Sequence, residues 1–296
     1  MTTTPSPVLV IGATGTIGRH VVPELRRRGA AVRAFVRDPG RAVEILGPDV
    51  QLAVGDLADP ASLRAAMTGV ERVYLACGNH PAQSGWECAA IDAAAAAGVA
   101  RIVKLSALDA EIGSPVAFAD AHGRIEQHLR ASGIDHVLLR PAFNMINLLA
   151  AADGIQQAGA VFLPAAGAVV AMIDPRDVAA VAAVVLTTDG HAGRSYELTG
   201  PAAVTFDDVT AQLSVVLDRP VGFVAVPDEA AVGQLVGAGV PEWFATNVVA
   251  QFGLLRRGTQ ADVRDVVRVL TGREPRSVGE FLRDHAAAFG AVGAAR

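Results

Sequence analysis

The sequence is poor in lysine and tyrosine. Among its 296 residues the only lysine is Lys104, and the only tyrosines are Tyr74 and Tyr196. A glycine, Gly78 or Gly200, stands four residues after each tyrosine, so the chain has no Tyr-x-x-x-Lys pair. A mechanism that draws its proton from a tyrosine beside such a lysine is therefore excluded.

Cysteine is equally scarce. Cys77 and Cys88 have neither metal-ligand spacing nor the number that a disulfide framework needs, which favours a reducing, cytoplasmic setting. No cluster of His, Cys, Asp and Glu has metal-ligand spacing, so we expect no metal. The first seven residues lack the basic region and apolar run of a signal peptide. Charges and glycines interrupt the alanine-rich stretches before a membrane-spanning length is reached.

Positive charge is also limited. The net charge is −5, which argues against broad nucleic-acid binding because that function needs a basic surface. Hydrophobic residues make up 51% and charged residues 19%, a composition typical of globular proteins. We expect a monomer or homodimer whose partner is a small molecule.

Short apolar runs alternate with helical segments in the first half of the chain. Such alternation, with runs buried on both faces, predicts an α/β fold built on a Rossmann-type, doubly wound parallel sheet. The expected strands are residues 8–11, 32–36, 50–54, 72–76, 101–105 and 136–139, and the expected helices are 16–28, 61–67, 87–97 and 118–131.

The rhythm changes after Pro141. We expect a helix at 144–152, a loop at 158–168, a helix at 174–186, a strand at 195–198 that returns to the sheet, a capping box at 205–208, a strand at 221–226 and mainly helix over 228–289. No linker marks a boundary. The predicted division is therefore interleaved: 1–145 and 174–200 form the cofactor domain, while 146–173 and 201–296 form a largely helical substrate lobe, with cofactor and substrate in the cleft.

A glycine-rich turn follows the first expected strand. Gly12, Gly15 and Gly18 recur at every third position between a strand and a helix. Glycines there allow a tight turn and a close approach of the backbone to a pyrophosphate, which the N-terminus of the helix then faces. This spacing predicts a dinucleotide site, although a simple βα turn would show the same glycines.

The end of the second strand indicates which dinucleotide binds. It carries Arg37, then Asp38, with Arg41 nearby, instead of an acidic residue for a ribose hydroxyl. A guanidinium suits a 2′-phosphate, so we expect NADP(H), although Arg37 and Asp38 could simply pair. Asp56 ends the third strand and could accept from adenine or cap a turn.

Several of these segments resemble the NmrA-like branch of the atypical short-chain dehydrogenases. The similar segments are 12–18, 36–39, 55–57, 103–106, 139–141, 174–177 and 196–201, spread over nearly the whole chain. The resemblance implies that Thr14, Gly15, Thr16 and Ile17 contact the pyrophosphate. It further implies the remaining cofactor contacts: Arg37 at the 2′-phosphate, Asp56 and Leu57 at adenine, Ala76, Cys77 and Gly78 at the ribose, and Pro141 to Asn144, including Phe143, near the nicotinamide.

The same alignment exposes a departure from the family. Phe118 takes the place of the family's tyrosine and His122 that of its lysine. His122 could contact the cofactor or donate a proton, titrating near neutral pH, and Glu126 could orient it from the next turn. A plain His122–Glu126 pair is the alternative. Ser106 ends the fifth strand, where the family places a serine near the substrate.

Weaker candidates lie on two segments. Asn79 and His80 follow the fourth strand on a loop that we expect to hold Gln83 and Trp86, and they could line the substrate or be solvated. Asn144 could bind substrate, although a helix cap is the simpler interpretation.

The resemblance thus implies an NADPH-dependent reductase that transfers hydride to a small apolar quinone, enone or ketone, with a proton from His122, Ser106 or water. Two alternatives stay open. One is an NADP(H)-binding redox sensor without turnover. The other is a cyclase or isomerase that uses the cofactor without net redox.

Overall fold

The computed structural model describes residues 6–290, and no helix in that part of the chain is long and apolar enough to cross a membrane. The fold divides into two compact units. The first runs to Pro141 and adds Pro175–Glu197, and the second combines Ala142–Asp174 with the chain from Leu198 onward. The chain therefore leaves the first unit after Pro141, returns to it at Pro175 and leaves it again after Glu197.

The first unit is built on a seven-stranded sheet. Its strands, in spatial order, are β3 (Gln51–Val54), β2 (Val32–Val36), β1 (Val8–Ile11), β4 (Arg72–Leu75), β5 (Arg101–Leu105), β6 (Asp135–Pro141) and β9 (Arg194–Leu198). The five pairings from β3 to β6 are parallel. The order reverses direction between β1 and β4, and open sheets of this kind bind ligands beyond the strand ends at such a switch point.

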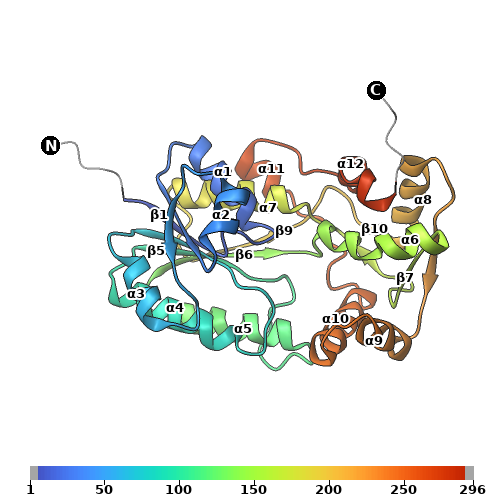
Figure 1. The fold of residues 1–296 in the computed structure, drawn as a ribbon, viewed down its shortest axis with the longest axis horizontal. Helices are drawn as coiled ribbons and strands as arrows, with labels where there is room; N and C mark the ends of the chain where they lie inside the picture. Colours follow the sequence, from blue (N-terminus) through green and yellow to red (C-terminus); the bar gives the residue numbers. More distant parts are fainter. Residues whose placement is uncertain (1–5, 291–296) are drawn as a thin grey trace. The chain divides into compact units, whose positions relative to one another are not determined.

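Helices cover both faces of this sheet (Figure 1). One face carries α1 (Gly18–Arg27), α2 (Pro39–Leu46) and α7 (Pro175–Thr187), and the other carries α3 (Pro60–Met67), α4 (Gln83–Ala96) and α5 (Ala117–Ala131). The second group packs on the aliphatic side chains of β1, β4 and β5 in one buried cluster. This is the doubly wound α/β fold that the alternating pattern predicted.

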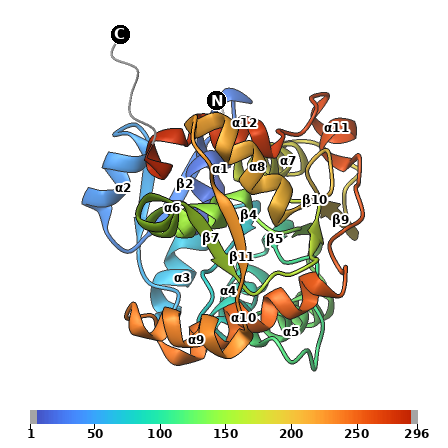
Figure 2. The same cartoon turned by 90° about the vertical axis from the view of Figure 1, so that its right-hand side faces the viewer.

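The second unit is mainly helical and has its own core. Its elements are the 3-10 helix η1 (Met145–Ala151), α6 (Ala152–Ala158), β7 (Ala160–Leu163), β8 (Val169–Val170), β10 (Val204–Thr205), α8 (Phe206–Leu217), β11 (Gly222–Ala225), α9 (Asp228–Gly237), α10 (Glu242–Arg256), α11 (Val266–Thr271), α12 (Val278–Asp284) and the 3-10 helix η2 (Ala286–Phe289). Figure 2 shows β7 beside β11 and α9 beside α10. Four phenylalanines lie at the centre of its core: Phe206, Phe252, Phe281 and Phe289.

Several expected elements are confirmed after Pro141. Helix α7, strands β9 and β11 and the capping box of Thr205 with Asp208 lie where the sequence placed them. The expectation of a loop over 158–168 was wrong, because β7 forms there by parallel pairing with β11. The stretch after Asn144 begins as a 3-10 helix, and α6 follows only from Ala152.

Two differences affect the cofactor unit. Helix α2 was not foreseen, and it forms because the Asp38 side chain caps it and Pro39 suits its first turn. Helix α4 begins at Gln83, four residues earlier than expected. Gln83 and Trp86 therefore belong to a helix, not to the preceding loop, and Gln83 is buried.

Candidate functional site: the dinucleotide turn and a buried polar cluster

The turn between β1 and α1 needs glycine at two positions for reasons internal to the fold. Gly12 has a φ of +79°, and a Cβ on it would lie 2.7 Å from the Ala76 carbonyl oxygen. A Cβ on Gly18 would lie only 2.0 Å from the Gly12 carbonyl oxygen. These glycines therefore allow β1, β4 and the start of α1 to approach one another closely.

Gly15 differs from its two partners. A Cβ there would meet only the Gly12 carbonyl oxygen, at 3.1 Å, and both Gly15 and Thr16 are exposed, with Thr14 partly so. Ile17, at the N-cap of α1, provides no side-chain cap for the helix N-terminus. Bare backbone at an uncapped helix N-terminus favours phosphate binding, so the turn fits a dinucleotide pyrophosphate.

The adenine end of the candidate site lies after β2 and β3. Arg37 is exposed, while Asp38 accepts the backbone N–H of Arg41 at 3.0 Å and thereby caps α2. The Asp56 carboxylate accepts the backbone N–H of Ala58 at 2.9 Å, and Leu57 packs at the edge of the aliphatic core. Asp56 thus serves as a turn cap, which leaves its other oxygen for a ligand, and its adenine contact stays a prediction.

The segment after β4 adjoins the glycine turn. Ala76 is buried against Gly12, Cys77 is half-buried and Gly78 is exposed with open space at its Cβ position. Burial, with a smaller effect of the Glu87 charge, raises the pKa of the Cys77 thiol to about 11. Cys77 therefore stays a protonated thiol at neutral pH and offers packing instead of nucleophilic chemistry.

The two tyrosines have no place in this chemistry. Tyr74 lies in β4 and is fully buried, and burial raises the pKa of its hydroxyl. The Tyr196 hydroxyl lies 2.8 Å from the Nδ1 atom of His191, near the last strand of the sheet. The tyrosine position of the family is held by Phe118, which is buried in α5.

Lys104, in β5, forms a buried ion pair with Glu87 of α4, which the sequence analysis did not predict. Its Nζ atom lies 2.8 Å from Oε2 of Glu87 in α4, and both side chains are 0% exposed. Gln83, one turn earlier, donates to the other carboxylate oxygen at 2.9 Å. Burial raises the pKa of Glu87, against the opposing attraction of the Lys104 charge. The feature of the sequence that could have indicated this ion pair is a single lysine within an otherwise apolar strand.

His122 joins this pair from α5. Its Nδ1 atom lies 3.3 Å from Nζ of Lys104, and the side chain is only 8% exposed. Burial, and then the Lys104 charge, lower the pKa of His122 well below 6.5. The expectation of titration near neutral pH is therefore corrected: His122 is a neutral imidazole there, able to donate a hydrogen bond but rarely charged.

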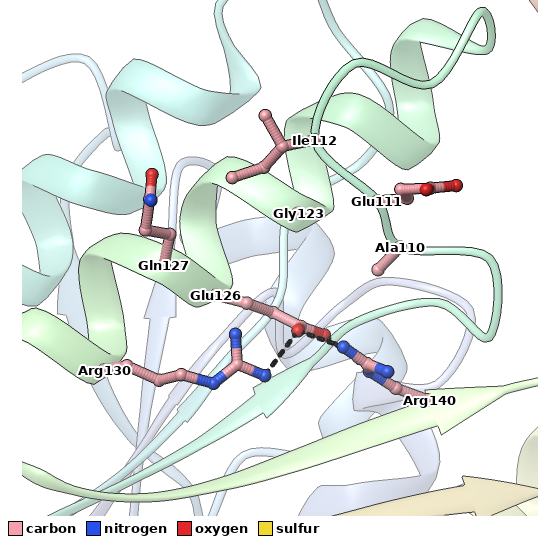
Figure 3. Close-up of a pocket in the computed structure, with 8 residues that line it drawn as sticks. All are labelled: Ala110, Glu111, Ile112, Gly123, Glu126, Gln127, Arg130 and Arg140. Atoms are coloured by element: carbon pink, nitrogen blue, oxygen red, sulfur yellow. Dashed lines mark hydrogen bonds and ion pairs between the residues drawn. The ribbon is translucent and has the colours of Figure 1, made fainter.

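Glu126 serves a different group from the one expected. It does not orient His122. Its carboxylate accepts hydrogen bonds from Arg130 at 2.9 Å and from two nitrogens of Arg140 (Figure 3). It also accepts the Ser106 hydroxyl at 2.6 Å. Burial alone would raise the pKa of Glu126, but the bonds from Arg140 and Ser106 hold it below its usual value. The predicted catalytic serine is thus buried with its hydroxyl directed at a carboxylate.

An open pocket of about 320 Å³ lies beside this network (Figure 3). It is lined by the 110–112 loop and by α5, with Arg130 and Arg140 at its wall. Both arginines are already paired with Glu126. None of its lining residues belongs to the glycine turn.

The remaining predicted residues lie at or after β6. The Pro141 carbonyl accepts the backbone N–H of Leu108 at 3.1 Å. Phe143 packs its ring 6.0 Å from that of Phe206, in the core of the second unit. Asn144 caps η1 by accepting the N–H of Ile146, as the simpler interpretation held. Nicotinamide contacts from this segment remain a prediction.

His80 and Asn79 stay on the loop before α4. His80 stacks on Trp86 with ring centroids 4.3 Å apart, and its Nδ1 atom receives the backbone N–H of Ala82. It therefore orders the start of α4. Across residues 6–290 no group of three or more His, Cys, Asp or Glu could hold a metal, and both cysteines are free.

Comparison with known proteins places this geometry in a family. Residues 12–189 match the model of an NAD(P)H-binding family. The chain belongs to the NAD(P)H-binding family. An NAD(P)H azoreductase of Xenophilus azovorans is 39% identical over 96% of this chain and 100% of its own length. A (4-alkanoyl-5-oxo-2,5-dihydrofuran-3-yl)methyl phosphate reductase of Streptomyces griseus is 40% identical over 95% of this chain and 99% of its own.

A solved structure extends the comparison to the fold. The NADPH-dependent quinone oxidoreductase QOR2 of Escherichia coli, complexed with NADPH, has a TM-score of 0.87 at 28% identity, covering 95% of this chain and 99% of its own. The resemblance to NmrA-like, atypical short-chain dehydrogenases is confirmed over nearly the full length. The chain is an oxidoreductase of this NAD(P)H-dependent type.

Proposed function

We propose that the protein is an NADPH-dependent reductase that transfers hydride to a small apolar quinone, enone or ketone. The relatives named above for azo, dihydrofuranone and quinone substrates support this class of reaction. The observation that carries the proposal is the state of the proton donors: Phe118 has none, His122 is neutral and the Ser106 hydroxyl is bound to Glu126.

Groups of the first unit would hold the phosphates and the ribose of the cofactor. When bound, NADPH supplies the hydride. The bare turn at Gly15 and Thr16 holds the pyrophosphate, and Arg37 binds the 2′-phosphate. Ala76 to Gly78 line the ribose. His122 donates a hydrogen bond to a ribose hydroxyl or to the substrate carbonyl, because a neutral imidazole can polarise a carbonyl without giving up a proton.

The acceptor follows from this lack of a strong acid. Hydride addition to a ketone leaves a strongly basic alkoxide that needs a proton, whereas a quinone leaves a stabilised phenolate that water can protonate later. General acid catalysis contributes roughly a hundredfold to ten-thousandfold. We therefore rank quinones above enones and enones above simple ketones as substrates.

We further propose that residues 146–173 and 201–296 bind the substrate. We also propose a cytoplasmic location and a monomer or homodimer. The two cysteines, neither of them in a disulfide, support a reducing environment.

Steady-state oxidation of NADPH against a matched panel tests the proposal. With the panel of one quinone, one enone and one ketone, we expect kcat/KM for the quinone to exceed that for the ketone by at least about a hundredfold. Arg37→Ala should weaken NADPH binding by about tenfold and leave NADH binding unchanged, since one charged contact is lost.

Two outcomes would replace the proposal. Tight NADPH binding without oxidation by any acceptor would favour the redox sensor. Conversion of a substrate with no net consumption of NADPH would favour the cyclase or isomerase. Equal wild-type affinity for NADPH and NADH would refute the role of Arg37.

A further inference from the structure

Lys104 has one ion-pair partner and two hydrogen-bond partners around one buried nitrogen. Its Nζ atom contacts Oε2 of Glu87 at 2.8 Å, the backbone carbonyl of Leu105, and Nδ1 of His122 at 3.3 Å. An ammonium group has three N–H donors and no acceptor. Because the ammonium has no lone pair, Nδ1 of His122 is the acceptor in the 3.3 Å contact and the ring hydrogen lies on Nε2.

This assignment also holds if the proton of the ion pair moves to Oε2 of Glu87. The amine would then accept from Glu87 and still donate to Leu105 and His122. A neutral amine whose lone pair faces Nδ1–H would reverse His122, and beside an ionised Glu87 it would leave that carboxylate without a cation. Both side chains are 0% exposed, and an uncompensated buried carboxylate is the costliest of these states.

We propose that Lys104 and Glu87 are positioning residues that fix His122 as the neutral Nε2–H tautomer. Glu87 holds the ammonium in place, Gln83 holds Glu87 at 2.9 Å, and the ammonium selects the hydrogen position on the imidazole. The tautomer assignment depends only on the contacts of Lys104 with Glu87, Leu105 and His122. That the Nε2–H then serves cofactor or substrate rests on the proposed function.

The cluster separates charge from hydrogen bonding. The positive charge lies on β5 and is neutralised by α4, while α5 presents only a neutral donor. Glu126, one turn from His122 on α5, is committed to Ser106 and Arg140. The hydrogen on His122 is therefore set from the strand and not from its own helix, which distinguishes this arrangement from a His–Glu pair along one helix.

Nitrogen-15 NMR of histidine side chains in the intact protein tests the tautomer directly. The signal of His122 is assigned by its loss in His122→Gln. We expect the Nε2–H pattern at neutral pH in the wild type. The double variant Glu87→Gln/Lys104→Met removes the ammonium without leaving a lone charge, and it should convert His122 to a mixture of tautomers. His128, a partly exposed histidine of the same helix paired with Asp92, is the internal control.

The outcomes separate this inference from the proposed function. An Nδ1–H tautomer or an imidazolium in the wild type would overturn the tautomer assignment, whatever substrate the enzyme reduces. This measurement on the wild type does not require any variant to fold. In the double variant we expect NADPH affinity or kcat/KM to fall at least about tenfold while His128 is unchanged. Mixed tautomers with wild-type affinity and turnover would overturn the positioning role, whereas an inactive wild type would count against the reductase.

Discussion

The buried pair of Glu87 and Lys104 makes a quantitative prediction about stability. Lys104→Met leaves a carboxylate inside the protein with one neutral donor, Gln83, and Glu87→Gln leaves a lone ammonium. Removing one partner of a buried ion pair costs about 3–5 kcal/mol. Each single variant should therefore lose that amount in the free energy of opening the central sheet.

The double variant should lose much less than the sum. With both charges gone, the remaining cost is the unsatisfied carbonyl of Leu105 and Nδ1 of His122, at about 1–3 kcal/mol each and so about 4 kcal/mol together at mid-range. The two singles sum to about 8 kcal/mol at mid-range, so the double-mutant cycle should give a coupling energy of about 4 kcal/mol.

Native-state hydrogen exchange of the β5 amides is the suitable assay because it reports opening of this strand without assuming that two units unfold together. Each single variant should speed exchange roughly 150-fold to 5,000-fold. The exposed pair of Asp265 and Arg268, at 3.1 Å, provides the control, and Asp265→Asn/Arg268→Met should couple by about 0.5 kcal/mol or less. A coupling below about 1 kcal/mol for the buried pair would refute the reasoning.

Two further predictions concern the glycine turn and acid stability. Gly15→Ala should stay folded but weaken NADPH binding at least about tenfold in calorimetry. Gly18→Ala should destabilise the fold, whereas the control Gly85→Ala, with open space at its Cβ position, should change neither stability nor binding. Normal NADPH binding by Gly15→Ala would show that the glycine motif is only a structural turn. Because the pKa of His122 is lowered in the folded state, the unfolded chain takes up a proton first as pH falls below about 6.5. The free energy of unfolding should therefore fall by up to about 1.4 kcal/mol per pH unit. Urea unfolding at successive pH values should show a shallower fall for His122→Gln, and an identical dependence on pH in both proteins would contradict the buried neutral state.

The sequence was sufficient for the parts of the fold that depend on local pattern. Unbroken aliphatic runs such as 8–11 indicate strands of a parallel sheet, and glycines at 12, 15 and 18 indicate the turn. Strand β7 was not predicted because Gly, Ala and Pro surround it and because its partner strand β11 is distant in sequence. Helix α4 was started late because Pro81 and Gly85 suggest a loop.

The candidate site likewise has one part that the local sequence predicts and one part that it does not. The pyrophosphate turn is a contiguous motif, so its residues could be named in advance. The polar cluster is not: Glu87, Lys104 and His122 come from α4, β5 and α5 and meet only once the sheet has formed. Helix spacing favoured a bond between His122 and Glu126, and only the packing of β6 shows that Arg140 and Ser106 occupy that carboxylate.

The position of positive charge connects the missing tyrosine to the choice of substrate. A cation on the helix beside a tyrosine helps that tyrosine release its proton, but Phe118 has no proton to release. Here the cation lies on β5, is neutralised by Glu87, and leaves His122 as a neutral donor. Such a site stabilises a developing negative charge only by hydrogen bonding. Acceptors that delocalise this charge themselves, as quinones do, are the ones whose reduction it can support.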